Sequence, residues 1–246
     1  ITDMHGTAPE EFRYSGRNVV AFRYGLTESA VISGGGPLVT VTQNMADHFK
    51  TKYGRRNLEF FNIPVFEDIE IRKDRKRPAT DKRTIIYAGG SQSWQNVDLM
   101  FSVISKTGSS FRYVILTGDT AFFTSKATEY GLSCDVEITS VAKEEVQAYY
   151  LSADFGFVLR DDNIVNRVAC PTKLMEYMAS GVIPVVIQPH IGDFAHLGYS
   201  YVAVDQLIAG DLPDTDKIEA MRSNNYMIME TMQKAAAEEA TQMVSR

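Results

Sequence analysis

The sequence is poor in cysteine and contains no long apolar run. Only two of its 246 residues are cysteines, Cys134 and Cys170, and they lie in unrelated sequence contexts. This content argues against a disulfide framework and favours a reducing compartment, so we predict a cytoplasmic location. No apolar run reaches the ~18 residues that a membrane-spanning helix needs, and no signal-peptide pattern is visible.

The sequence also lacks an excess of positive charge and several catalytic signatures. Its formal net charge is −6, so no overall basic field favours binding to nucleic acid. It has neither the G-x-S-x-G element of serine hydrolases nor the G-x-G-x-x-G fingerprint of nicotinamide-dinucleotide sites. His190 and His196 flank Asp193 at a spacing that does not place metal ligands on one helix face. We therefore expect no metal and no cofactor.

What is present is the composition of an ordinary soluble α/β protein. Hydrophobic residues make up 44% and charged residues 23% of a chain that is long enough for two modest domains. Strand-like and helix-like segments alternate, which predicts parallel sheets covered by helices. The predicted strands cover residues 1–5, 37–42, 58–65, 84–88, 111–116, 135–139, 154–159, 182–186 and 199–204. The predicted helices cover residues 18–33, 44–52 with Asn44 as N-cap, 97–106, 121–130, 143–152, 172–180 and, as one or two helices, 215–243. Residues 6–16 are predicted to form a polar loop.

A basic segment divides the chain. Residues 67–83 contain several Lys and Arg side chains and Pro78, and we predict a linker there. The simpler interpretation is a solvated connection between two domains. The alternative is a surface that binds phosphate or lipid headgroups, and such a surface would allow peripheral contact at the inner face of the cell membrane. Residues 1–66 would be the C-terminal part of an incomplete Rossmann-like domain, and residues 84–246 a second Rossmann-like domain with C-terminal helices. Right-handed crossovers predict the strand order 3-2-1-4-5-6 for the second sheet.

Residues 167–186, RVACPTKLMEYMASGVIPVV, form the most informative stretch. Pro171 suits the first turn of a helix, and Gly181 suits its end. Lys173 lies in the first turn, near the C-terminal edge of the sheet, where open α/β folds bind ligands. Glu176 follows one turn later and could accept hydrogen bonds from a ribose diol, as carboxylates do in dinucleotide sites. The alternative is an amphipathic surface helix whose charges are solvated.

Three cationic side chains, Arg160, Arg167 and Lys173, flank this helix start. Together with the unpaired N–H groups of the first turn, they suit a diphosphate. The competing interpretation is that Arg160 pairs with Asp161 or Asp162 and contributes nothing to a ligand site.

Several segments carry a family resemblance. YAGG at 87–90, TGD at 117–119, ADFGFVLR at 153–160 and PTKLMEYMASGVIPVV at 171–186 resemble the GT-B glycosyltransferases, and specifically their retaining group-1, GT4-like family. In the first part, DMHGTAPEE, VTVTQNMADHFKTKYG and FFNIPVF resemble the end of that family's first domain and the crossing into the second. The resemblance implies two Rossmann-like domains with doubly wound parallel sheets. It also implies retaining transfer of a sugar from a nucleotide-diphosphate sugar to a saccharide or lipid-linked acceptor, in polysaccharide or glycolipid biosynthesis.

The resemblance also implies roles for single residues. His5 matches the family histidine near the donor sugar and is the predicted catalytic residue, and Glu176 matches the glutamate that binds the ribose. Gly89 and Gly90 match the family's glycine turn after the first strand of its nucleotide domain. Pro171, Thr172 and Lys173 match the start of its diphosphate-binding helix. The predicted donor-binding residues are Gly89, Gly90, Arg160, Arg167, Pro171, Thr172, Lys173 and Glu176.

The chain departs from the family pattern in two places. The family's E-x7-E pair requires an acid at Val168, and the basic residues that many relatives carry after the first strand fall at Gly90 and about Gln95. We hypothesise that the three cations near the helix start supply the missing charge. Trp94 either stacks on the base or sugar or fills the core.

These departures leave two other functions open, a non-catalytic GT-B-like module that binds a nucleotide sugar or a partner, and a sugar-nucleotide epimerase. The chain begins at Ile1 without an initiator Met, inside a motif-like segment. We therefore expect it to be part of a longer protein, with most acceptor contacts upstream and no transferase activity of its own.

Overall fold

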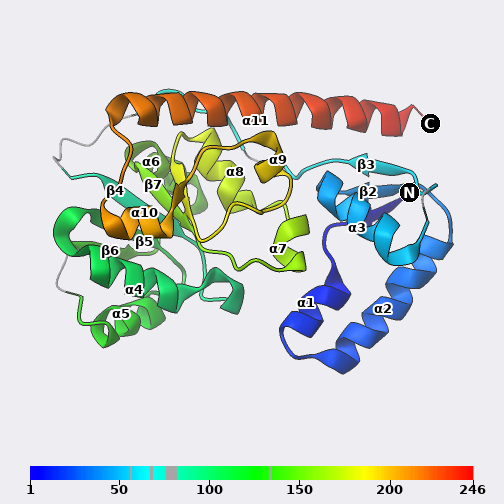
Figure 1. Cartoon of the computed structure of the whole chain (residues 1–246), viewed down its shortest axis with the longest axis horizontal. Helices are drawn as coiled ribbons and strands as arrows, with labels where there is room; N and C mark the ends of the chain where they lie inside the picture. Colours follow the sequence, from blue (N-terminus) through cyan, green and yellow to red (C-terminus); the bar gives the residue numbers. More distant parts are fainter. Residues whose placement is uncertain (56, 67–68, 76–81, 133–134, 246) are drawn as a thin grey trace.

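The computed structural model describes residues 1–55, 57–66, 69–75, 82–132 and 135–245. These residues form two parallel sheets, one of three strands and one of six (Figure 1). Residues 67–68 and 76–81 of the basic segment, among them Lys76, Arg77 and Pro78, and the cysteine Cys134 lie outside the described residues.

The smaller sheet has the order β1-β2-β3, and its strands are short and partly exposed. Its elements are β1 (Thr2–Met4), α1 (Ala8–Tyr14), α2 (Asn18–Ser33), β2 (Leu38–Thr40), α3 (Gln43–Tyr53) and β3 (Phe60–Asn62). The predicted loop at 6–16 is wrong, because most of it is α1. This helix starts with Pro9 in its first turn, where proline is well tolerated, and it buries Glu10 against Lys52 of α3.

The start of α3 also differs from the prediction. Its N-cap is Thr42, whose hydroxyl accepts a hydrogen bond from the backbone N–H of Met45 at 3.0 Å. We call residues 1–66 the first part of the chain and residues 84–246 the second part. Asn44 donates a hydrogen bond from its side-chain amide to the carbonyl of Gly192, in the second part, at 2.6 Å. The helix ends at Tyr53, one residue after the predicted end, because Gly54 adopts the left-handed conformation with φ +62°.

The larger sheet has the order β6-β5-β4-β7-β8-β9, with all strands parallel. This confirms the predicted order 3-2-1-4-5-6. Its strands are β4 (Thr84–Ala88), β5 (Arg112–Leu116), β6 (Val136–Thr139), β7 (Phe155–Val158), β8 (Ile183–Val186) and β9 (Val202–Ala203). All residues of β7 and β8 are buried, as expected of continuously apolar strands covered on both faces.

Helices cover both faces of this sheet. They are α4 (Val97–Thr107), α5 (Thr120–Glu129), α6 (Lys143–Ser152), α7 (Ile164–Val168), α8 (Thr172–Ala179), α9 (Phe194–Leu197), α10 (Val204–Ala209) and α11 (Thr215–Val244). Two short 3-10 helices lie at Ser93–Gln95 and Gly108–Ser110. The sequence did not predict α7, α9 or α10, because four to six residues are too few to show a helical period. The predicted strand at 199–204 is reduced to Val202–Ala203, since Val204 already begins α10.

The terminal segment forms one helix, α11, of 30 residues. It packs against α8 of the second part and continues along the molecule to β3 of the first part (Figure 1). Within the part of the chain that the structure describes, no helix is both long and apolar enough to cross a bilayer.

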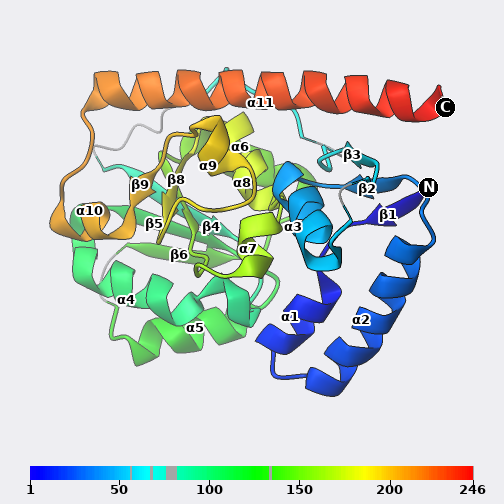
Figure 2. The ribbon, with the colours of Figure 1, turned by 45° about the vertical axis from the view of Figure 1, so that its right-hand side comes forward.

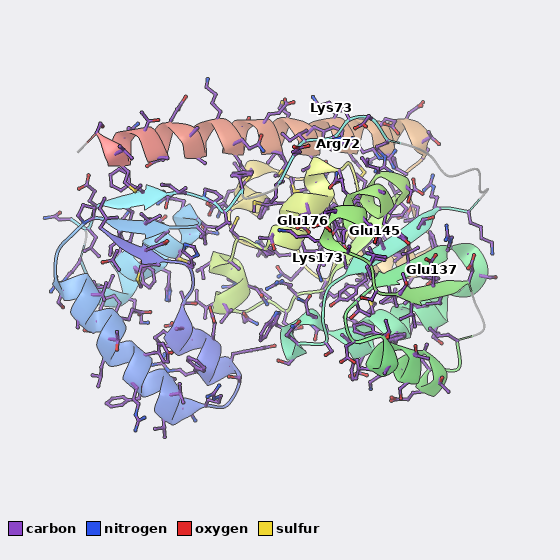
Figure 3. All side chains as sticks on the ribbon, turned by 180° about the vertical axis from the view of Figure 1, so that it is seen from behind. Arg72, Lys73, Glu137, Glu145, Lys173 and Glu176 are labelled. Carbon is purple, nitrogen blue, oxygen red and sulfur yellow. The ribbon has the colours of Figure 1, made fainter. Side chains whose placement is uncertain are left out.

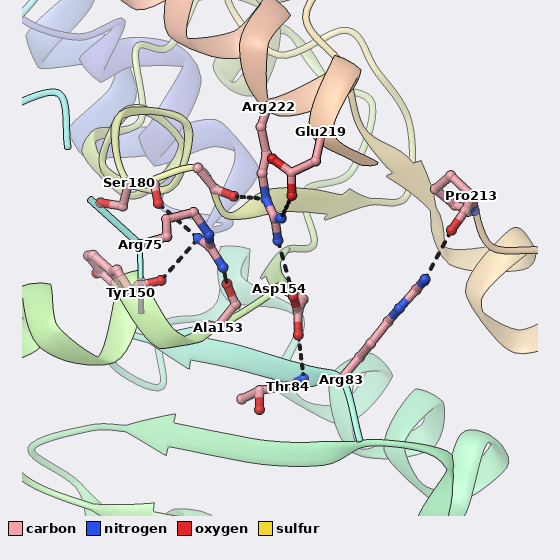
Figure 4. A network of polar contacts seen from close by, with 11 residues as sticks. Arg75, Arg83, Thr84, Tyr150, Ala153, Asp154, Ser180, Pro213, Glu219 and Arg222 are labelled. Atoms are coloured by element: carbon pink, nitrogen blue, oxygen red, sulfur yellow. Dashed lines mark hydrogen bonds and ion pairs between the residues drawn. The ribbon is translucent and has the colours of Figure 1, made fainter. Parts of the chain in front are cut away.

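The basic segment is not solvated throughout. The guanidinium of Arg75 enters the second part and donates to the carbonyls of Ser180, at 2.9 Å, and Ala153 (Figure 4). The ion pair between Arg222 and Asp154, with 3.0 Å between nitrogen and oxygen, lies beside it. Burial, and then the charge of Arg222, lower the pKa of Arg75 to about 10. Arg75 is therefore not a solvated charge, and it anchors this segment to the second part.

Candidate functional site

Two cavities meet at the C-terminal edge of the larger sheet. One, of about 960 Å³, lies at the ends of β5 and β6 and reaches Tyr150 of α6. The other, of about 860 Å³, lies between the two parts of the molecule and extends from His5 to Arg160. Both are lined by Gly89, after β4, and by Thr172 and Glu176 of α8. The loop after β4 and the start of α8 therefore form the point where the cavities join.

Glycine is favoured at position 89 because its backbone φ is +156°, a conformation that L side chains rarely adopt. A Cβ atom on Gly89 would lie 2.8 Å from the ammonium nitrogen of Lys173 and 3.2 Å from the hydroxyl of Tyr87. A Cβ on Gly90 would meet only the flexible end of Gln92. Gly90 lines neither cavity; its carbonyl accepts a hydrogen bond from Tyr87 at 2.5 Å. Of the two predicted glycines, only Gly89 therefore lines the cavities.

The start of α8 opens on the cavities. Pro171 is the N-cap, one position before its predicted place in the first turn. Its carbonyl accepts from the backbone N–H groups of Leu174, at 3.0 Å, and Met175, at 3.3 Å. No side chain among the described residues caps the helix, so the N–H groups of Thr172 and Lys173 are available to an anionic ligand.

Lys173 and Arg160 are the two cations beside this helix start. The ammonium of Lys173 lies 3.9 Å from the centroid of the Tyr87 ring and donates to the side chain of Gln95 at 2.9 Å. Burial, and then the charge of Arg160, lower the pKa of Lys173 to about 7, although Glu176 acts in the opposite direction. Burial also lowers the pKa of Arg160.

Among the described residues, neither cation has a carboxylate partner. Arg160 donates to the side-chain oxygen of Asn166 at 3.0 Å, and no ion pair among the described residues involves Arg160 or Lys173. Pairing of Arg160 with Asp161 or Asp162 is therefore not found. Two desolvated cations that lack a counterion form a site suited to an anion.

Arg167 lies elsewhere. Its guanidinium forms a bidentate ion pair with Asp162, with nitrogen–oxygen distances of 2.6 and 2.8 Å. This pair lowers the pKa of Asp162. The side chain is 55% exposed and lines a third cavity, of about 580 Å³, together with His190 and His196. The structure thus brings two of the three predicted cations to the joined cavities, and Arg167 is not one of them.

Glu176 lies where the two cavities join, one turn of α8 after Lys173 (Figure 3). One carboxylate oxygen accepts a hydrogen bond from the hydroxyl of Tyr150 at 3.0 Å. Burial raises the pKa of Tyr150, so the phenol stays protonated and acts as a donor. The sequence did not predict this contact, since Tyr150 lies on a different helix 26 residues earlier. Tyr150 orients the carboxylate that the sequence predicts to bind a ribose.

His5 lines the cavity between the two parts. Its ring nitrogen Nε2 lies 2.6 Å from the carboxylate of Asp3, and both side chains are exposed. Asp3 was not among the predicted site residues, although residues two apart on a strand share a face and the DMH spacing places Asp3 and His5 two apart. Trp94 lines the same cavity and is 44% exposed, so it does not fill the core.

Val168 joins the two parts of the molecule. It is 2% exposed and packs in an apolar cluster whose other fully buried members all come from the first part. Those members are Ile32, Leu38, Val41, Met45 and Phe49. The carbonyl of Val168 accepts a hydrogen bond from the hydroxyl of Thr42 at 2.7 Å. Position 168, where the family pattern requires an acid, thus serves packing in this chain.

A carboxylate from the second part caps α3 of the first part. Asp193 accepts hydrogen bonds from the backbone N–H groups of Gln43, at 2.6 Å, and Asn44, at 2.9 Å. A negative charge at a helix N-terminus is stabilised by the helix dipole. Among the described residues, no group of three or more His, Cys, Asp or Glu side chains is arranged to hold a metal ion.

Comparison with known proteins identifies the fold. No protein-family model matches the chain, and no curated protein matches it in sequence. Among solved structures, Alr3699/HepE from Anabaena in complex with UDP and glucose matches all of this chain and 71% of its own, with 13% identity and a TM-score of 0.68. The chain has the GT-B fold.

Two further solved structures agree with this assignment. The GtfA/B complex matches 89% of the chain with a TM-score of 0.64, and TarM from S. aureus, solved with UDP, matches 98% with a TM-score of 0.56, each at 13% identity. The chain spans 47% of the length of each of these two proteins. The GT-B assignment confirms the predicted α/β class with two Rossmann-like parallel sheets, of which the first is incomplete relative to these structures.

Proposed function

We propose that this GT-B chain belongs to a glycosyltransferase that takes its sugar from a nucleotide-diphosphate sugar. The observation that carries the proposal is the junction of the two cavities at Gly89, Thr172 and Glu176, beside Lys173 and Arg160, which lack counterions. An elongated ligand with a negative charge in its middle fits this arrangement. The HepE structure holds UDP and glucose, which supports a donor of this class.

The donor would lie across both cavities. Its nucleoside would occupy the cavity at the ends of β5 and β6, where Thr117 and Ser140 line the wall. Its ribose would be held by Glu176, and its diphosphate would lie at the start of α8. Its sugar would then extend into the cavity between the two parts, towards His5.

The site residues would stabilise the departing diphosphate. As the bond between the anomeric carbon and the phosphate oxygen breaks, negative charge grows on the diphosphate. The N–H groups at the start of α8, Lys173 and Arg160 would receive this charge, and each charge-assisted hydrogen bond contributes about 1.5–3 kcal/mol. Helix dipole and basic side chains would thus take the role that a metal ion has in other transferases. We propose transfer with retention at the anomeric carbon.

The acceptor would enter from the first part of the molecule. Glu11, Tyr14 and Arg17 line the far wall of the cavity that His5 also lines. We propose a saccharide or a lipid-linked saccharide as acceptor, in the cytoplasmic biosynthesis of a polysaccharide or glycolipid.

One observation favours a second candidate, a module that binds a nucleotide sugar without transferring it. Val168 places an apolar side chain in a packed cluster at the position of the expected acid. The site would then keep its anion-binding part and lack a catalytic carboxylate.

A two-stage experiment tests the proposal. The first stage is a thermal-shift screen of the chain with UDP, GDP, ADP and their sugars, because a ligand that binds only the folded state raises the apparent stability. We expect one nucleotide diphosphate to raise the melting temperature, and no shift with any of them would contradict a donor site. The second stage incubates the responding nucleotide sugar with the full-length protein. Release of free nucleotide diphosphate supports a transferase. Formation of an isomeric nucleotide sugar supports an epimerase, and binding without turnover supports the non-catalytic module.

A further inference from the structure

Trp94 is the only tryptophan of the chain, and it lines the cavity between the two parts. Its side chain is 44% exposed, although tryptophan is on average a highly buried residue. It belongs to none of the apolar clusters that the described residues form. A large aromatic surface on the wall of this cavity is therefore open to a ligand.

The loop that carries Trp94 is fixed on both sides. The side-chain oxygen of Gln95 accepts a hydrogen bond from the ammonium of Lys173 at 2.9 Å. Asn96 has a left-handed backbone with φ +49°, which asparagine tolerates better than most residues, and its amide donates to the carboxylate of Asp161 at 3.0 Å. The same carboxylate accepts a hydrogen bond from α1 of the first part. Trp94 thus lies between the proposed diphosphate site and a contact that joins the two parts.

Two buried polar groups on the wall of this cavity lack a hydrogen-bond partner in the part of the chain that the structure describes. They are the hydroxyl of Thr7, whose residue is 0% exposed, and the amide nitrogen of Asn163. The side-chain oxygen of Asn163 accepts a hydrogen bond from the backbone N–H of Asn166 at 3.0 Å, so the nitrogen is the unpaired group. Thr7 and Asn163 precede α1 and α7, two helices of different parts that lie side by side (Figure 2). Because an unpaired buried donor is costly, a ligand hydroxyl that pairs with it is stabilised.

The cavity at the ends of β5 and β6 has neither feature. Trp94, Thr7 and Asn163 line only the cavity between the parts, and none of them lines the other one. The nucleoside is proposed to bind at the ends of β5 and β6, so Trp94 does not lie where it could stack on the base.

A sugar ring matches the cavity between the parts. A pyranose carries C–H groups on its faces and hydroxyls around its rim. Its face can pack on an aromatic ring, while its hydroxyls pair with polar groups of the wall. A cavity that combines one large aromatic surface with a few unpaired polar groups therefore suits a saccharide better than it suits a purely apolar or a purely ionic ligand.

We propose that Trp94 is the platform on which a sugar ring stacks, and that the unpaired groups of Thr7 and Asn163 bind sugar hydroxyls in the same cavity. The ring belongs either to the nucleotide-sugar donor or to the saccharide acceptor, and both present the same chemistry to the indole. This inference rests on the proposed function and deepens it, since it assigns the residue that contacts the sugar.

The test uses tryptophan fluorescence, because Trp94 is the only tryptophan and the emission reports its surroundings alone. The chain is titrated with the nucleotide diphosphate that the thermal-shift screen selects, with the corresponding nucleotide sugar, and with free glucose at a saturating concentration of that nucleotide diphosphate. We expect the emission to shift to shorter wavelength when a sugar covers the indole, beyond any change that the nucleotide diphosphate causes. A shift with the nucleotide sugar assigns the ring to the donor, and a shift with glucose alone assigns it to the acceptor.

Calorimetric titration of variants in the responding arm tests the contact itself. Trp94→Ala should weaken binding of the sugar ligand about fivefold, the loss of one aromatic stacking contact, and should leave the affinity for the nucleotide diphosphate unchanged. Trp94→Phe keeps an aromatic face and should stay within about twofold of the wild type. Phe22→Ala is the matched control, because Phe22 is an aromatic residue of α2 that is 65% exposed and lies outside both cavities, and it should bind like the wild type.

Failure of this inference and failure of the proposed function have different signatures. Absence of a thermal shift with every nucleotide contradicts the donor site. Normal binding of the nucleotide diphosphate, with an emission of Trp94 that responds neither to the nucleotide sugar nor to glucose, overturns the sugar platform alone. An equal loss of affinity for the sugar ligand and for the nucleotide diphosphate in Trp94→Ala would also overturn it, because Trp94 would then only shape the loop beside Lys173.

Discussion

The two parallel sheets of this molecule are stabilised in different ways. In the larger sheet, β7 and β8 are buried on both faces by apolar clusters that the surrounding helices complete. In the smaller sheet the strands are partly exposed, and its helices meet around the ionic cluster of Glu10, Glu28 and Lys52. The first part therefore depends on this ionic cluster as well as on the apolar cluster that it shares with Val168 of the second part. The proposed donor site lies mostly in the second part, beside the larger, apolar sheet.

The largest effect should come from Val168, which links the two sheets. Val168→Glu would place a carboxylate in an apolar cluster, and we expect the free energy of unfolding to fall by about 3 kcal/mol. Val168→Ala, which removes only two methyl groups, should cost about 1–2 kcal/mol. Chemical denaturation measures both. If Val168→Glu were as stable as the wild type and raised sugar transfer, the packing role of this position would be wrong.

The ionic cluster should make the first part sensitive to acid. Burial of Glu10 acts to raise its pKa, but hydrogen bonds from His48 and Lys52 and the charge of Lys52 outweigh it, and the pKa falls from 4.5 to about 2. The folded-state pKa lies below the unfolded one, so the stabilisation is present above pH 4.5 and is lost as the pH falls towards 2. We expect a loss of about 2 kcal/mol over this window.

The control for this prediction is Glu10→Gln, which cannot titrate. Its melting temperature should be lower than that of the wild type at pH 7 and should change less between pH 4.5 and 2. Parallel curves for the two proteins would show that Glu10 is not the source of the acid sensitivity.

A smaller effect is expected at the cap of α3. Asp193→Asn keeps a hydrogen-bond acceptor but removes the negative charge at the helix start, so we expect a loss of about 1 kcal/mol. Asp205→Asn, in the first turn of α10 within the second part, is a control that leaves the contact between the parts intact. Nucleotide binding should be unchanged in both variants. Reduced binding in Asp193→Asn alone would show that the contact also shapes the donor site.

The sequence predicted the second sheet better than the first for a physical reason. Buried strands such as β8 and helices of ten residues carry strong local patterns, which predicted their positions and the strand order. Helix α1 has only seven residues, and its burial depends on Lys52 of α3. The local sequence pattern of α1 carries no information about this contact, because Lys52 lies about forty residues later in the chain. The same holds for the basic segment, in which Arg75 donates to carbonyls that lie far away in the sequence.

The candidate site shows the same limit. The position of Lys173 and Glu176 at the start of a helix is a local property, and the structure places both at the junction of the cavities. The orientation of Arg167 depends on Asp162, five residues earlier, and this pair turns it away from that junction. The contacts of Glu176 with Tyr150 and of Lys173 with Tyr87 join separate elements, so only the fold reveals them.

The central claim is that Lys173, and not Arg167, binds the diphosphate, and calorimetric titration with the nucleotide diphosphate selected by the thermal-shift screen tests it directly. At pH 6.5, Lys173→Ala should weaken binding about tenfold or more, the loss of one charge-assisted hydrogen bond, and Arg167→Ala should bind like the wild type. Since the pKa of Lys173 is about 7, wild-type affinity should fall as the pH rises above 7 and the ammonium loses its proton, whereas Lys173→Ala should lack this dependence. Equal affinity of Lys173→Ala and the wild type, or a loss in Arg167→Ala alone, would contradict the account.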